Sequence, residues 1–85
     1  MEKIYKYPLE ITDNQLVVLP IGARVLSVKN QGGVPTIWAM HSQDADTVNV
    51  EVMLVGTGNE FELQDWRFID TVVCDTFVWH VFMRE

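Results

Sequence analysis

The sequence predicts an all-β fold, a small compact sandwich or barrel of about six to eight mostly antiparallel strands with at most one short helical turn. Apolar residues alternate with polar ones at a period of two along most of the chain. β-Branched and aromatic residues dominate the apolar positions, and clusters of Gly, Pro, Asn and Asp separate the alternating segments. With 85 residues the chain is too short for two cores, so we expect a single domain over residues 1–85.

Seven segments have the alternation and the flanking turn signals of a strand. They are residues 3–11, 15–19, 23–30, 36–41, 48–55, 66–73 and 77–84.

Local signals refine several of these segments. Pro8 favours an edge position for the first strand, because proline has no N–H for a neighbouring strand. Gly32-Gly33 and Asp75-Thr76 predict tight hairpin turns. Residues 60–66 are the one stretch that could hold a helical turn. The last strand is apolar on both faces, which predicts that it is covered on two sides.

Charge and cysteine content exclude several classes of protein. Six Lys and Arg against 12 Asp and Glu give a net charge of −6, which is not the basic footprint of a duplex nucleic-acid binder. No apolar run has the roughly 20 residues of a membrane helix, and the start of the chain lacks the apolar core of a signal peptide. The single Cys74 permits no internal disulfide and is expected to be a small core residue. We therefore expect a cytoplasmic protein that binds no membrane.

No catalytic or metal-binding constellation is evident, so we expect neither an enzyme nor a cofactor. His41 and His80 are the two histidines available as general bases. His80 lies between apolar residues of a strand and is expected to be a hydrogen-bonded structural residue, whereas His41 adjoins a polar loop and is expected to be solvated. Asp44 and Asp46 supply too few oxygens for calcium, and two His with one Cys make a zinc site improbable.

Two features suggest a ligand instead. Gly56-Thr57-Gly58 has the composition of a loop whose N–H groups converge on an anion, although the same sequence is also typical of a simple turn. The indoles of Trp38, Trp66 and Trp79 either stack on bases, or fill the core or an oligomer interface. We expect Trp79 in the core, and Trp38 either there or facing a groove.

The order of several short motifs resembles a family of small phage-encoded proteins over nearly the whole chain. These motifs are Tyr5-Lys6-Tyr7-Pro8-Leu9, Leu19-Pro20, Gly22-Ala23, Val25-Leu26, Gln31, Pro35, Ile37-Trp38-Ala39, Gly56-Thr57-Gly58, Phe68-Ile69 and residues 78–82. The resemblance implies a relation to phage anti-CBASS sponges, which sequester cyclic dinucleotide signals and assemble into oligomers. Asn59 stands where many relatives are expected to carry a His, so a role for that side chain does not transfer.

The resulting hypothesis is a non-enzymatic phage immune-evasion protein, acting in the cytoplasm of the infected bacterial host. It would hold a cyclic dinucleotide, or a related small phosphorylated ligand, as a homo-oligomeric sponge (a dimer or tetramer). Trp38 or Tyr7 would stack on a base, Gln31 would bind a base edge, and Lys6 and Arg24 would supply positive charge. Gly56, Thr57 and Gly58 would line the phosphate or ribose.

Two other hypotheses remain open at this point. An acidic, anti-CRISPR-like inhibitor would mimic nucleic acid and block a host defence effector. Its working surface would consist of Asp44, Asp46, Glu51, Glu60, Glu62 and Asp65. Carboxylates gathered on one exposed face would favour this hypothesis. The third possibility is a structural or assembly protein of the virion.

Overall fold

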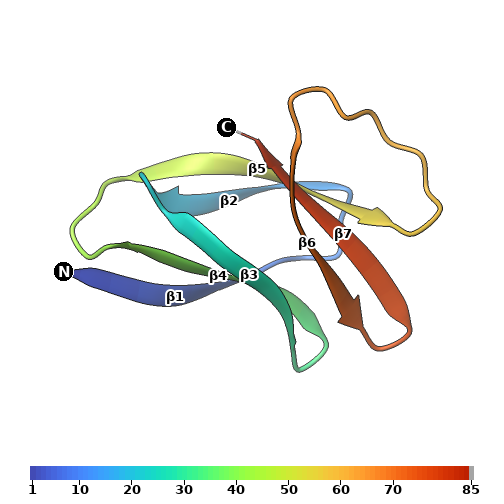
Figure 1. The fold of residues 1–85 in the computed structure, drawn as a ribbon, viewed down its shortest axis with the longest axis horizontal. Coiled ribbons are helices and arrows are strands. Elements are labelled where there is room, and N and C mark those ends of the chain that lie inside the picture. The colour runs from blue at the N-terminus through green and yellow to red at the C-terminus, as the bar shows by residue number, and fades with distance from the viewer. Residues whose placement is uncertain (85) are drawn as a thin grey trace.

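A computed structural model describes residues 1–84, which form seven β-strands and no helix (Figure 1). The strands are β1 (Glu2–Pro8), β2 (Asn14–Pro20), β3 (Arg24–Gln31), β4 (Val34–Ser42), β5 (Thr47–Gly56), β6 (Arg67–Cys74) and β7 (Phe77–Arg84). The predicted all-β class is confirmed, and each predicted strand is found with its bounds moved by a few residues. Nothing in residues 1–84 forms a helix of the length and apolarity needed to cross a bilayer.

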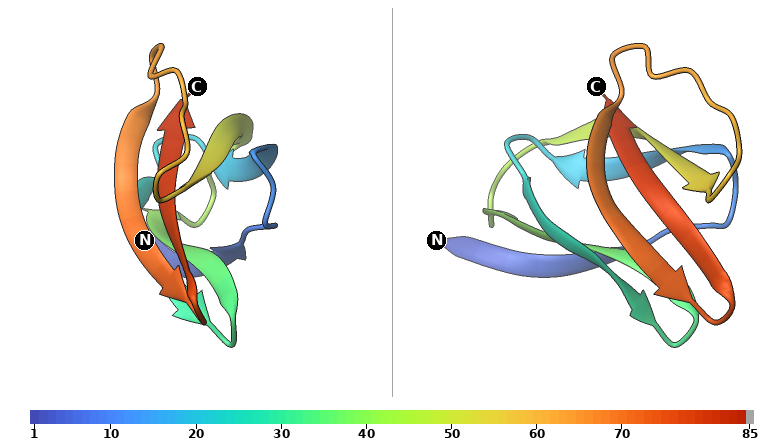
Figure 2. Two further views of the ribbon diagram at one scale, coloured as in Figure 1. Left: turned by 90° about the vertical axis from the view of Figure 1, so that its right-hand side faces the viewer. Right: turned by 45° about the vertical axis from the view of Figure 1, so that its right-hand side comes forward.

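The strands form two antiparallel sheets, one in the order β1-β4-β3 and the other in the order β2-β5-β7-β6. The sheets pack face to face, and the edge strands β3 and β6 lie against each other on one side (Figure 2). Asp70 of β6 joins these two edges, because its Oδ2 accepts the N–H of Val28 on β3 at 2.9 Å. Its Oδ1 accepts the N–H of its own neighbour Thr71 at 2.9 Å. The side chain of Asp70 therefore connects the β6 edge of one sheet to the β3 edge of the other.

The predicted turns explain how neighbouring strands reverse. Gly32 and Gly33 have φ values of 60° and 91° between the paired residues Gln31 and Val34, the left-handed backbone that a two-residue hairpin of this type requires. Asp75, with a φ of 57°, begins the β6–β7 turn. Pro8 lies in an edge strand, as predicted. Residues 57–66 form a loop with two short turns, and the permitted helical turn does not form there.

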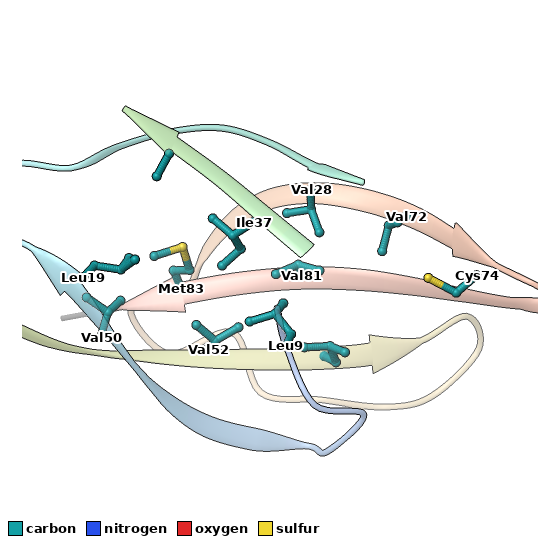
Figure 3. Close-up of a cluster of buried hydrophobic side chains, with 12 residues drawn as sticks. Leu9, Leu19, Val28, Ile37, Val50, Val52, Val72, Cys74, Val81 and Met83 are labelled. Carbon is teal, nitrogen blue, oxygen red and sulfur yellow. The ribbon is translucent and has the colours of Figure 1, made fainter. Parts of the chain in front are cut away.

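The core lies between the sheets and draws side chains from both of them (Figure 3). Its fully buried members include Ile37 of β4 and Val81 of β7. Cys74 is buried and Trp79 packs against this core, so both predictions are confirmed. The opposite face of β7 buries Phe82 beneath the 57–66 loop, with Met53, Val55 and Trp66. The last strand is therefore covered on both faces at Val81–Met83, as its sequence predicted, whereas Phe77 at its start is exposed.

Candidate functional site

Positive charge is concentrated in the three-stranded sheet of this acidic chain. Its strands carry Lys3, Lys6, Arg24 and Lys29, four of the six cations, against the single carboxylate of Glu2. That difference gives the strands of this sheet a formal charge of +3, although the whole chain carries −6. The acidic residues lie mainly in the other sheet and in the loops.

The strand register places three of these cations on the outward face of the sheet. Residues directly opposite in an antiparallel pair share a face. Ile37 and Ala39 of the central strand β4 are buried in the core, so Trp38 and Met40 face outward, and Thr36 lies on their side of the sheet but is only 1% exposed. The register then defines three rows across this surface, which we call the basic face: Arg24–Met40–Ile4, Ser27–Trp38–Lys6 and Lys29–Thr36–Pro8.

Trp38 is the half-buried centre of the basic face. Lys6 lies directly beside it on β1, and Arg24 and Lys29 belong to the two adjacent rows on β3. Opposed Cβ atoms in such a sheet lie about 4.5–5.5 Å apart and diagonal neighbours about 7–8 Å apart, within reach of long side chains. None of the three exposed cations forms an ion pair within the part of the chain that the structure describes. The result is a half-buried indole with three cations in its own and the adjacent rows, none of them held in an ion pair within residues 1–84.

Four of the eight predicted ligand residues lie on this face. Lys6, Arg24 and Trp38 belong to its three rows, and Gln31 extends it along β3, opposite Val34. Sequence reasoning missed Lys29, although its alternation with Ser27 and Gln31 on one strand was a usable signal.

Tyr7 lies on the opposite face of the same sheet and contacts His41. The Tyr7 hydroxyl donates to His41 Nε2 at 2.8 Å, and His41 Nδ1–H donates to the Ser42 carbonyl at 3.0 Å. Burial, and then the neighbouring Tyr5, raise the pKa of Tyr7. The prediction that His41 is solvated is wrong, because its position on β4 faces inward and leaves it 5% exposed.

Gly56 is the last residue of β5 in the other sheet, and Thr57 and Gly58 follow it in a β-turn. The Asn59 N–H donates to the Gly56 carbonyl at 3.1 Å, and Gly58 has a φ of 89°. A Cβ at Gly56 would lie 2.9 Å from Asn59 Nδ2, so glycine lets the Asn59 side chain fold over the turn. The backbone N–H of Asn59 is therefore used within the turn by its hydrogen bond to the Gly56 carbonyl.

Thr57 belongs instead to a hydrogen-bonded cluster around His80. Its hydroxyl lies 2.8 Å from His80 Nε2, and the Thr71 hydroxyl lies 2.9 Å from His80 Nδ1. His80 is hydrogen-bonded, as predicted, and it ties the turn to strands β6 and β7. The participation of Thr71 was not visible in the sequence, because it follows from the register that places it opposite His80.

A groove of about 560 Å³ lies between the 57–66 loop and the ends of β5 and β7. Asp13, Glu60 and Glu62 line it together with Trp66 and Arg84. Arg84 is already engaged, because its Nε donates to Glu51 at 2.9 Å and its guanidinium lies 4.2 Å from the Trp66 ring centre. The groove is therefore acidic and offers no free cation to a phosphate. Within residues 1–84, no three His, Cys, Asp or Glu side chains are placed to hold a metal ion.

Comparison with known proteins identifies the chain at the level of its family. No curated protein and no solved structure matches it. A family profile described as "Domain of unknown function (DUF7352)" matches residues 1–85, the full length of the sequence. The chain, with its two antiparallel sheets and its basic face, therefore belongs to the DUF7352 family.

Proposed function

We propose that the basic face binds a small phosphorylated nucleotide, with a cyclic dinucleotide as the preferred class, and holds it without chemical change. One observation carries the proposal: Trp38 faces outward from β4, with Lys6 opposite it and with Arg24 and Lys29 in the two adjacent rows of the register. Aromatic side chains stack on bases of any sequence, and neighbouring cations compensate the charge of the phosphates. The strands fix the backbone of these residues, so binding requires no backbone ordering, although the three long cationic side chains lose rotamer freedom.

Each residue has a defined part in this proposal. Trp38 stacks on a base, and Lys6, Arg24 and Lys29 contact the phosphates. Ser27, opposite Trp38, and Gln31, at the end of β3, supply hydrogen bonds to base edges or ribose. Tyr7 does not contribute to this binding site because it lies on the inner face of the sheet. The Gly56–Gly58 turn does not contribute because it follows β5 of the other sheet.

The electrostatics support a local rather than a long-range attraction. The chain as a whole carries −6 and repels an approaching dianion, but charges further apart than about 8 Å are largely screened at physiological salt. A ligand within that distance of the basic face meets mainly its three unpaired cations. Binding by this face should therefore weaken as salt is added.

Sequestration follows from binding alone, so this function needs no catalytic group. Under this proposal the protein acts as a phage-encoded sponge in the cytoplasm of an infected bacterium and lowers the free concentration of the signal. The alternative of nucleic-acid mimicry has less support. Asp44 and Asp46 lie in the β4–β5 connection and Glu60, Glu62 and Asp65 in the 57–66 loop, at opposite ends of the long axis (Figure 1).

The test is titration calorimetry of the intact protein against a panel of cyclic di- and trinucleotides. Trp38→Ala should weaken binding of the best ligand by about 1–3 kcal/mol, or roughly 5- to 150-fold in Kd. The matched control is Phe77→Ala, which removes a 61% exposed aromatic side chain from the other sheet and should leave Kd unchanged. A panel without binding, or equal affinities for wild type and Trp38→Ala, would contradict the proposal.

A further inference from the structure

The two sheets have four edge strands, and three of them are protected against pairing with another chain. Strand β1 carries Lys3, Lys6 and Pro8, which are typical protective residues of an exposed edge. Strands β3 and β6 cover each other through the Asp70–Val28 hydrogen bond. Each of them also contains a register irregularity that interrupts regular pairing.

Strand β2 has no lysine or bulge and, within residues 1–84, no covering strand, and its one edge proline, Pro20, lies at its end. Its sequence, NQLVVLP, contains no charged residue, and its register with β5 is continuous from Asn14 to Pro20. Its outward side chains Leu16 and Val18 are 64% and 54% exposed. A straight, uncharged and apolar edge strand is a surface that natural proteins rarely leave unpaired.

The alternation of hydrogen bonds along β2 shows which of its backbone N–H and C=O groups do not bond to β5. The Leu54 N–H donates to the Asp13 carbonyl at 3.2 Å, in the same register that pairs β2 with β5. In an antiparallel ladder every second residue bonds to the neighbour, so residues 15, 17 and 19 bond to β5. The N–H and C=O groups of Leu16 and Val18 therefore point away from β5 along the open edge. Pro20, which has no N–H, points in the same direction, as edge prolines do.

We propose that β2 pairs with β2 of a second copy of this chain, antiparallel and around a two-fold axis at Val17. This register sets the free backbone groups of Leu16 against those of Val18 of the partner subunit, and the reverse. It also packs the two exposed apolar side chains together on the outer face. The four-stranded sheets of the two copies then form one continuous sheet across the dimer.

Charge explains why two copies of so acidic a chain can meet at this edge. The carboxylate directly opposite the exposed side chains in the register is Glu51, which pairs with Leu16. Arg84 neutralises it at 2.9 Å from the next strand. The edge thus presents no uncompensated charge along its apolar positions, so it adds no repulsion of its own between two chains of net charge −6. A self-complementary strand also favours a second copy over an unrelated protein.

The test measures oligomeric state in a concentration series by sedimentation or light scattering, without any ligand. We expect wild type to have twice the mass of one chain, and Leu16→Lys/Val18→Lys to have the mass of one. In the proposed register, that double variant places a lysine at position 16 opposite a lysine at position 18 of the other copy, twice across the interface. It alters only exposed side chains. The matched control is Val73→Lys, on the same face at the other edge of the sheet, where Val73 is 57% exposed. It should remain a dimer.

Hydrogen exchange gives a second measurement if the double variant fails to fold. In wild type, dilution below the dissociation midpoint should remove protection of the Leu16 and Val18 amides and leave that of Val52 on β5. A wild type that stays monomeric at every concentration would overturn the proposal. A dimer that survives the double substitution, or one dissociated by Val73→Lys instead, would also overturn it. These readouts do not depend on nucleotide binding.

Discussion

Removing the Asp70 carboxylate should loosen the closed side of the sandwich. Its Oδ2 is the acceptor for the N–H of Val28, a residue that is 1% exposed, so Asp70→Ala leaves a buried donor without a partner. A loss of this kind costs about 1–3 kcal/mol of the free energy of unfolding. At about 4–8 °C per kcal/mol for a domain of this size, the expected fall in Tm is large.

Asp70→Asn separates the hydrogen bond from the charge. The amide keeps one carbonyl oxygen as an acceptor for Val28, so this variant should lose less stability than Asp70→Ala. Both are measured by urea unfolding, with Asp44→Ala as the control at an exposed loop carboxylate, where a change within about 0.5 kcal/mol is expected. Stability of Asp70→Ala equal to that of the control would refute the idea that this side chain closes the sheet edge.

Two further predictions concern buried polar groups. Tyr7→Phe removes the donor to His41 Nε2 and should lower the free energy of unfolding in urea by about 1–3 kcal/mol. An unchanged urea midpoint would show that this hydrogen bond does not stabilise the fold. Burial, and then Asp75, raise the pKa of Cys74, so its contribution to stability is present below about pH 9 and is lost as the pH rises through the folded pKa. Mass spectrometry should find Cys74 unmodified by iodoacetamide at pH 8 in the native protein and modified in urea, and rapid native labelling would contradict this.

Alternation and turn residues predicted the fold class well, because they depend on interactions between residues that are close in the sequence. The period-two alternation of residues 48–55 and 77–84 marks strands wherever those strands lie in the sheet. Gly32-Gly33 and Asp75 require left-handed backbone that few residues adopt, so the positions of both hairpin turns were readable. Residues 60–66 lacked such a signal, since their loop is held by Phe61 and Trp66 packing near Phe82.

The candidate site was only partly predictable, because it depends on which strands become neighbours. Trp38 and Tyr7 were expected in one site, yet the pairing of β1 with β4 sends them to opposite faces of the same sheet. His41 was misplaced for the same reason, since a polar neighbouring loop says nothing about which face of β4 is inward. The role of Asp70 was also hidden, because its partner Val28 is 42 residues away in the sequence.

By itself, the sequence determined that this chain is all-β, where its strands run and where it turns, since alternation and turn chemistry act between residues close along the chain. Only the tertiary structure decided which strands pair and which side of each faces water. Those choices gathered Lys6, Arg24, Lys29 and Trp38 on one surface and left β2 as the unprotected edge. These arrangements follow from pairing between strands that are distant in the sequence. That pairing is set by the burial of one face of each sheet in a common core.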